Sequence, residues 1–135
     1  MTDGQRIVII VDDDEPVRKA TRRLVKSFGF VVETFASAED FLDSGRPDRT
    51  CCLILDLKMP GMSGLELQRR LIDAGRQIPI VFVTGFADDR TQSEAMEAGA
   101  LGFLAKPFRE DDLLDCLQLA LKQRSIDART ASSPS

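Results

Sequence analysis

The sequence predicts an α/β fold, a doubly wound parallel sheet with helices on both faces, and two observations support this prediction. Short apolar runs alternate along the chain with longer segments that have helical spacing of apolar residues, strand then helix, five times over. Most of these runs are continuous and bounded by turn signals, which is typical of strands buried on both faces. Strands that alternate with helices in this way form a parallel sheet covered on both sides.

The predicted strands cover residues 7–11, 31–35, 52–55, 80–83 and 101–105. Four of them are continuous apolar runs, so we expect these four to be buried on both faces. The exception is VVETF at 31–35, whose alternation of apolar and polar residues favours an edge strand.

Helix signals fill the spaces between the runs. Helical spacing of apolar residues from Val17 to Phe28, with Pro16 in the first turn, predicts the first helix. Ser37 and Ser63, each followed three residues later by an acidic residue, open the second and third helices as in a capping box.

A weakly apolar helix is expected over 88–98, and leucines at 113, 117 and 121 mark the last helix. A glycine follows four of the helices, as expected where a left-handed residue ends a helix: Gly29, Gly45, Gly75 and Gly99.

The composition restricts the class of protein. A chain of 135 residues with 43% apolar residues is expected to form one domain, residues 1–124, followed by a flexible tail or the start of a linker at 125–135. The net charge of −4 argues against nucleic acid as a partner of this domain. No apolar stretch approaches the roughly 20 residues that cross a membrane, and the first residues do not form a secretion signal.

The three cysteines do not make a disulfide framework, which predicts a cytoplasmic location. Cys51 and Cys52 are adjacent, so we expect them on opposite faces of a strand, as small apolar fillers. The chain has no histidine, so a phosphoryl group carried here must be on another residue type.

Four of the predicted strands are followed by polar residues that can act together. Asp12 and Asp13 follow the first run and Asp56 follows the third. The carboxyl ends of parallel strands meet at one edge of the sheet, where ligands bind at the point of reversal in strand order. Three carboxylates at one place repel strongly unless a cation is present, and Mg²⁺ prefers such oxygen ligands.

Thr84 with Gly85, and Lys106 with Pro107, follow the last two runs and add a hydroxyl, a backbone N–H and an ammonium, which are suitable donors to a phosphate. The Asp56 carboxylate could attack phosphorus to give an acyl phosphate. Each residue also has a simpler explanation, since acids after a strand can cap the next helix and Thr84 can simply end a strand.

The segments VDDDEPVR, LILDLKMPGMSG, VFVTG and FLAKPF, in this order, together resemble the receiver domain of two-component response regulators over about residues 5–122. The segments DDDEPVRKA, SAEDFL and DLKMPGMSGLEL are most similar to the FixJ-like branch, whose members usually carry a C-terminal helix-turn-helix domain. The resemblance implies the CheY-like, flavodoxin-like (βα)5 fold with strand order 2-1-3-4-5.

The resemblance also implies a role for each matching residue. Asp56 would be the phosphoacceptor. Asp13, Asp56 and the backbone carbonyl of Lys58 would ligate Mg²⁺, for which Mn²⁺ or Ca²⁺ can substitute, and Asp12 would hold a water of the metal. The remaining roles are phosphate contacts for Thr84, Gly85 and Lys106, a conformational switch for Thr84 and Phe103, and tuning of dephosphorylation for Lys58 and Phe86. Bulky Phe86 is expected to shield the acyl phosphate from water.

The implied partner is a sensor histidine kinase that donates its phosphoryl group to Asp56. The face made by the fourth helix, fifth strand and fifth helix would then signal, through a homodimer or an effector, and a C-terminal output domain would control transcription. A stand-alone receiver in a phosphorelay is an alternative, and so is a receiver that is never phosphorylated. The domain would catalyse its own phosphorylation and dephosphorylation and would not be an enzyme in the usual sense.

Two rival functions fit the residues less well. A dehalogenase-type phosphatase needs a second acid two residues after its nucleophile, and Lys58 is at that position. A flavodoxin-like FMN site needs a phosphate loop rich in Ser, Thr and Gly after the first strand, where this chain has the acidic segment DDDEP.

Overall fold

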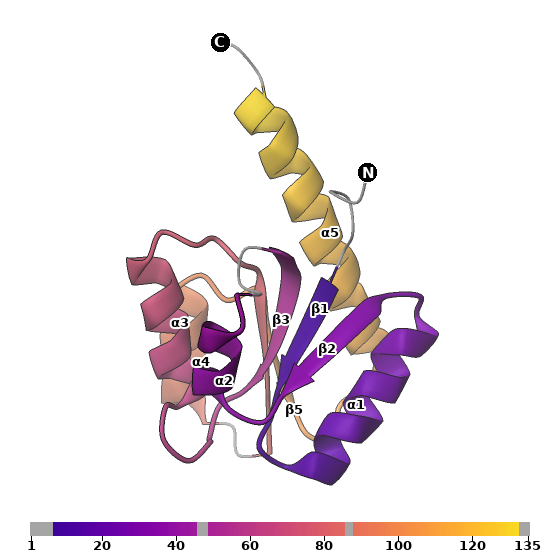
Figure 1. Cartoon of the computed structure of the whole chain (residues 1–135), viewed down its shortest axis with the longest axis vertical. Helices are drawn as coiled ribbons and strands as arrows, with labels where there is room; N and C mark the ends of the chain where they lie inside the picture. Colours follow the sequence, from indigo (N-terminus) through magenta and orange to yellow (C-terminus); the bar gives the residue numbers. More distant parts are fainter. Residues whose placement is uncertain (1–6, 46–48, 86–87, 133–135) are drawn as a thin grey trace.

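The computed structural model describes residues 7–45, 49–85 and 88–132, with side chains through residue 123. The described residues form one parallel five-stranded sheet in the order β2-β1-β3-β4-β5, which confirms the predicted fold and strand order (Figure 1). The strands are β1 (Ile7–Val11), β2 (Val31–Phe35), β3 (Thr50–Asp56), β4 (Ile80–Thr84) and β5 (Gly102–Ala105).

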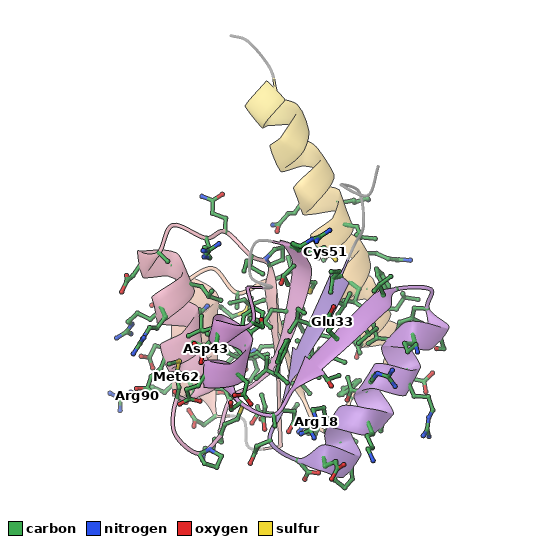
Figure 2. The ribbon with its side chains drawn as sticks, in the orientation of Figure 1. Arg18, Glu33, Asp43, Cys51, Met62 and Arg90 are labelled. Carbon is green, nitrogen blue, oxygen red and sulfur yellow. The ribbon has the colours of Figure 1, made fainter. Side chains whose placement is uncertain are left out.

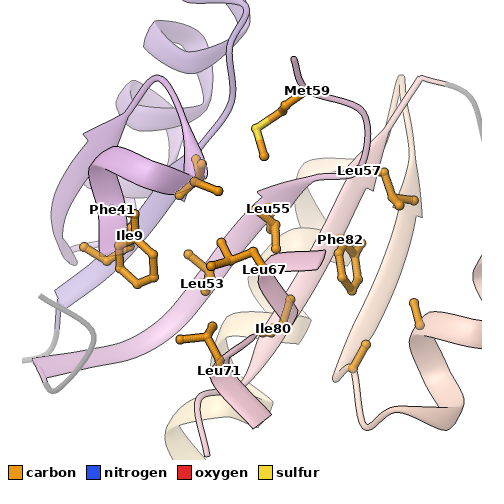
Figure 3. Packing of buried hydrophobic residues seen from close by; sticks show 14 of the residues in the cluster. Ile9, Phe41, Leu53, Leu55, Leu57, Met59, Leu67, Leu71, Ile80 and Phe82 are labelled. Carbon is orange, nitrogen blue, oxygen red and sulfur yellow. The ribbon is translucent and has the colours of Figure 1, made fainter. Parts of the chain in front are cut away.

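Helices cover both faces of the sheet. They are α1 (Glu15–Ser27), α2 (Ala38–Asp43), α3 (Gly64–Asp73), α4 (Asp89–Glu97) and α5 (Glu110–Ser132). One apolar cluster joins the sheet to α2, α3 and α4 through Phe41, Leu67, Leu71 and Ala95 (Figure 3). A second cluster joins the opposite face to α1 and α5. The sheet is therefore the middle layer of three.

Burial separates the central strands from the edges. All residues of β1, β3 and β4 are buried, as their apolar runs predict. Strand β2 is an edge strand with half-exposed residues, as its alternation predicts. The expectation that the run 101–105 is buried on both faces was wrong, because β5 forms the other edge and its residues are only partly buried.

The predicted helix signals act as caps. The hydroxyl of Ser63 accepts the N–H of Glu66 while the Glu66 carboxylate accepts the N–H of Ser63, a complete capping box at the start of α3. Ser37 caps α2 by accepting the N–H of Asp40. The four glycines that follow helices all have positive φ, between 76° and 104°.

Ser63→Ala is expected to lower the free energy of unfolding by about 1 kcal/mol, because it leaves an N-terminal N–H of α3 without its acceptor. Urea unfolding followed by circular dichroism measures this change. Ser93→Ala in α4, at an exposed helical position, is the matched control and should change stability by less than about 0.5 kcal/mol. Equal losses in the two variants would contradict a capping role for Ser63.

The expectation that Cys51 and Cys52 lie on opposite faces was wrong. Both side chains belong to the cluster under α1 and α5, and Figure 2 shows Cys51 beside α5. The pairing of β1 with β3 explains this, since Ile7 pairs with Thr50 but Val8 pairs with Cys52. Cys51 is the extra residue of a β-bulge, which breaks the strict alternation of the strand.

Helix α5 continues to Ser132, past residue 124 where the sequence places the end of the domain, and its last turns rise beyond the sheet (Figure 1). The domain boundary stays a prediction. In the described part of the chain, no helix combines the length and the apolar character that crossing a membrane requires.

Candidate functional site

The register of the sheet brings the polar residues after the strands together. Val11 pairs with Leu55, so Asp12 lies next to Asp56 beyond the ends of β1 and β3. Asp56 in turn pairs with Val83, and Thr84 pairs with Ala105. The side chains that follow β1, β3, β4 and β5 therefore share one edge of the sheet, at the point where strand order reverses between β1 and β3.

Three carboxylates form the centre of this site. One carboxylate oxygen from each of Asp12, Asp13 and Asp56 lies within 4.8 Å of the others. Asp12 and Asp56 are only 5% and 9% exposed, whereas Asp13 is exposed. Three hard oxygen donors in one group, open to solvent on the side of Asp13, suit Mg²⁺, Mn²⁺ or Ca²⁺.

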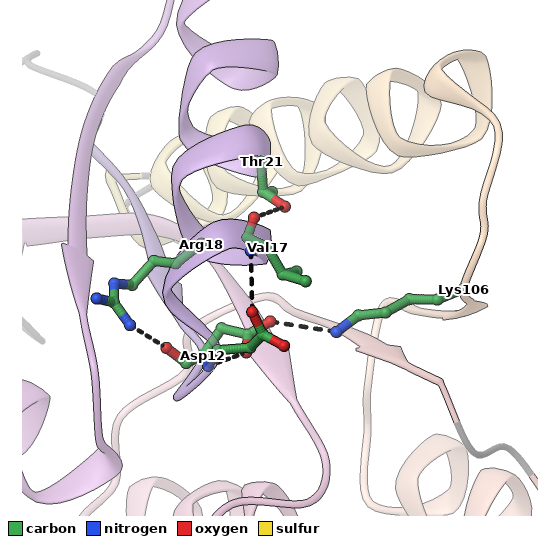
Figure 4. Close-up of polar contacts among 6 residues, drawn as sticks. Asp12, Val17, Arg18, Thr21 and Lys106 are labelled. Carbon is green, nitrogen blue, oxygen red and sulfur yellow. Dashed lines mark hydrogen bonds and ion pairs between the residues drawn. The ribbon is translucent and has the colours of Figure 1, made fainter.

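One ammonium reaches the acids from the end of the edge strand β5. Lys106 Nζ lies 3.2 Å from Asp12 Oδ2, and both side chains are largely buried, at 23% and 7% exposure (Figure 4). The backbone N–H of Lys106 donates to the Thr84 carbonyl at 2.8 Å, which ties the end of β5 to the end of β4. The bond between Lys106 and Pro107 is cis, as the sequence allowed.

The environment shifts the acidity of Asp56. Burial raises the pKa of Asp56 from 3.8 to about 6, and the nearby Asp12 carboxylate adds to the rise. The charge of Lys106 opposes this rise, Asp13 adds to it, and the backbone N–H of Lys58 opposes it by a hydrogen bond. Without a metal, Asp56 is therefore a buried carboxylate that is costly to ionise.

The acids in the segment after β1 make different hydrogen bonds and have different roles. Asp14 caps α1 by accepting the N–H of Val17 at 3.2 Å, so the helix-capping explanation holds for this acid. Asp12 Oδ1 accepts the N–H of Asp14 at 2.9 Å. Asp12 thus orients the segment and belongs to the acidic group as well.

Arg18 also contributes to the site, and the sequence reasoning did not find it. Its Nη1 donates to the backbone carbonyl of Asp12 at 2.7 Å (Figure 4), and Figure 2 shows it at the start of α1. Helical side chains point toward the N-terminus of their helix, so a long cation in the second turn could have been expected to reach this segment.

The remaining predicted site residues lie around the same edge. Thr84 is buried, at 1% exposure, while Gly85 and Lys58 are exposed. Phe103 is partly buried in β5, its ring centre 6.1 Å from that of Phe82. Phe86 lies outside the described residues.

Chemically, the site combines a group of oxygen donors that suits a cation, a buried carboxylate at Asp56 and an ammonium paired with Asp12. The cation and the ammonium would offset the negative charge that a phosphoryl group brings.

Comparisons with known proteins agree with this arrangement. Residues 8–118 match the response regulator receiver domain. The chain is 47% identical over 122 residues to the response regulator protein TmoT of Ectopseudomonas mendocina, covering 90% of this chain and 56% of that one. It is 42% identical over 113 residues to the transcriptional regulatory protein FixJ of Rhizobium meliloti (strain 1021), covering 84% and 55%. It thus spans about half the length of these curated relatives.

Solved structures give the same result. The structure of the response regulator StyR superposes with a TM-score of 0.83 at 45% identity, covering 95% of this chain and 67% of that one. The structure named FixJ-N superposes with a TM-score of 0.77 at 42% identity, covering 85% and 92%. With its sheet order, its acidic group and its sequence in agreement, the chain belongs to the family of response regulator receiver domains.

Proposed function

We propose that Asp56 accepts a phosphoryl group from a histidine kinase in a reaction that requires Mg²⁺, and that the modified domain changes conformation to signal. The observation that carries the proposal is the group of three carboxylates with Lys106 beside it. This group lies beyond the carboxyl ends of β1 and β3, where the strand order reverses. Membership of the receiver family supports the kinase as partner.

Asp13, Asp56 and the backbone carbonyl of Lys58 are the ligands that we assign to the cation, with Asp12 holding one of its waters. When bound, the cation supplies positive charge that offsets the carboxylates and the incoming phosphoryl oxygens. The three acids fit this role because their oxygens lie within 4.8 Å of one another.

In the transfer step, an oxygen of the ionised Asp56 carboxylate forms a bond to phosphorus while the bond from phosphorus to the kinase imidazole nitrogen breaks. The imidazole keeps the electron pair of that bond and takes up a proton. A pKa of about 6 leaves most Asp56 ionised at pH 7, so the nucleophile is available before any cation binds. Lys106 would move its ammonium from Asp12 toward the phosphoryl oxygens, and Thr84 and Gly85 would donate hydrogen bonds to them.

The signal that we propose passes through Thr84 and Phe103. Thr84 would move toward the phosphoryl group and Phe103 would rotate into the space vacated, which biases an existing equilibrium between inactive and active states. The face of α4, β5 and α5 would then change shape and pair with a second copy or an effector. Lys58 and Phe86 would set the lifetime of the acyl phosphate.

The relatives suggest the context of this signal. TmoT is named a response regulator and FixJ a transcriptional regulatory protein, and this chain spans about half of each. We propose that residues 1–124 are the receiver domain, that 125–135 lead toward an output domain that controls transcription, and that the protein works in the cytoplasm. A stand-alone receiver in a phosphorelay is the alternative arrangement.

The test is to incubate the protein with acetyl phosphate and MgCl₂ and to measure the intact mass. We expect a gain of one phosphoryl group, and no gain with Asp56→Asn or without a divalent cation. Asp13→Asn and Asp14→Asn form a matched pair, because Asp13 belongs to the acidic group while Asp14 caps α1, a role that Asn also fills. Asp13→Asn should show no increase in mass, and Asp14→Asn should gain one phosphoryl group as the unsubstituted protein does.

A gain that persists in Asp56→Asn would show that another residue is modified. No gain in the unsubstituted protein would favour a receiver that binds its partner without phosphorylation.

A further inference from the structure

Helix α4 is held to the rest of the domain by few buried groups. Of the residues in α4, only Ala95 is buried, and the side chains around it are polar or exposed. Two hollows, of about 430 and 260 Å³, flank the contact between α3 and α4, and both are lined by Gln68, Ile72 and Ala98. Because α4 has little apolar contact with the rest of the domain, individual polar contacts contribute strongly to its position.

One such contact is a buried amide between the two helices. Gln68 in α3 is 3% exposed, and its Nε2 donates to the carbonyl oxygen of Ala95 at 3.1 Å. The same carbonyl accepts the N–H of Ala100 at 3.0 Å, which belongs to the turn that ends α4. Gln68 therefore binds the C-terminal end of α4 from the neighbouring helix, which is consistent with the adjacent positions of α3 and α4 in Figure 1.

The end of α4 packs against the same face of the sheet as the two residues to which we assign the switch, Thr84 and Phe103. Ala95 and Ala100 belong to the apolar cluster that includes Phe82, and Phe103 packs against that cluster. Thr84 follows Phe82 by two residues in β4, so it is on the same face of the sheet. A displacement of α4 would therefore change the space into which Phe103 can turn.

We propose that Gln68 is a positioning residue whose hydrogen bond to Ala95 holds α4 in the resting arrangement and so biases the domain against activation. This inference rests on the proposed function, since it concerns the regulation of the same site. Gln68 touches none of the three carboxylates in the acidic group and takes no part in the transfer step. Loss of its amide should loosen the resting state and leave the nucleophile unchanged.

The test compares Gln68→Met with a matched control. Methionine keeps the length and the unbranched shape of glutamine but donates no hydrogen bond. Thr21→Val is the control, because Thr21 is also buried and its hydroxyl also donates to a helix carbonyl, that of Val17 at 2.9 Å, but it lies on α1 under the opposite face of the sheet. Initial rates of phosphoryl uptake from acetyl phosphate with Mg²⁺ are measured by intact mass, and thermal midpoints are measured alongside.

We expect Gln68→Met to take up the phosphoryl group faster by roughly fivefold, the equilibrium factor that one net hydrogen bond gives. Thr21→Val should match the unsubstituted protein in rate even where its thermal midpoint falls. Equal rates in all three proteins, a slower rate in Gln68→Met, or the same change in both variants would overturn the proposal. A lack of uptake in the unsubstituted protein is a different result, because it contradicts the proposed function itself.

Hydrogen exchange tests the inference even if the unsubstituted protein takes up no phosphoryl group, or if Gln68→Met fails to fold. In unmodified Gln68→Met, the amides of Gly99 and Ala100 should exchange faster while those of α1 do not change. In the unsubstituted protein, the same two amides should lose protection when Asp56 is phosphorylated. Unchanged protection in the folded variant, or unchanged protection on phosphorylation, would show that the contact does not hold the resting state.

Discussion

Without metal at pH 7, Asp56→Asn is expected to be more stable than the unsubstituted protein by about 2 kcal/mol, since solvent screens part of the unfavourable charge, and this corresponds to a rise of roughly 6 °C in thermal midpoint. The pKa of Asp56 is about 6 in the folded protein and 3.8 ordinarily, because of burial and then the Asp12 carboxylate. The folded state binds the proton more tightly, so this group favours folding below about pH 4. That contribution is lost as the pH rises to about 6.

Urea unfolding in EDTA across this range measures the effect. The stability of the unsubstituted protein should fall relative to Asp56→Asn as the pH rises, and the difference should level off above about pH 7. Adding Mg²⁺ should narrow the difference, since a cation at ten times its Kd stabilises by about 1.4 kcal/mol and Asp56→Asn lacks a ligand. Asp43→Asn, at an exposed end of α2, is the control and should stay within about 0.5 kcal/mol. A destabilised Asp56→Asn would mean that the repulsion inferred at this site is absent.

The second large effect is expected at Gly64, where Gly64→Ala should cost about 2 kcal/mol of stability. A Cβ at this position would collide with the backbone carbonyl oxygen of Asp56, and would lie 3.1 Å from both Leu57 Cα and Phe82 Cε1. Two of these atoms are backbone, so they cannot rotate away as the end of a flexible side chain can. The collision also pushes on the peptide of the proposed nucleophile, so we expect slower phosphoryl uptake as well.

Gly85→Ala is the matched control for stability. Its φ is not in the left-handed region, and an added Cβ would meet no atom within 4 Å. Urea unfolding should place it within about 0.5 kcal/mol of the unsubstituted protein. If Gly64→Ala were equally stable, α3 would have to shift away from the end of β3 without loss, which the hydrogen bond from Gly64 N–H to the Leu57 carbonyl at 2.9 Å opposes.

The features that could be predicted from the sequence are those that follow from local chemistry. The central strands are apolar runs because both of their faces are covered, and the capping box at Ser63 needs only residues three apart. The convergence of Asp12 and Asp56 could be predicted because parallel strands place their carboxyl ends at one edge. Their detailed roles stay proposals, and Phe86 lies outside the described residues.

The features that were missed depend on partners far apart in the sequence. The burial of β5 depends on its place at the edge of the sheet, which its own apolar residues do not reveal. The bulge at Cys51 depends on how β3 pairs with β1. Gln68 reads as an ordinary polar residue of a helix, and it becomes informative only once the end of α4, 27 residues later, is placed against it.

The helices on the two faces of the sheet are fixed in different ways. On the side of α1, Arg18 and the cap at Asp14 tie down the segment that carries Asp12 and Asp13. On the opposite face, α4 has one buried residue, Ala95, and two cavities lie along its contact with α3, one of them reaching Pro79 and Ile80 at the start of β4. We therefore expect substitutions along α1 to alter the Mg²⁺ concentration that phosphorylation requires. Substitutions along the α3–α4 contact should instead alter how strongly phosphorylation of Asp56 changes the conformation of the domain. The cation requirement of such a domain and the size of its response to phosphorylation could then evolve independently.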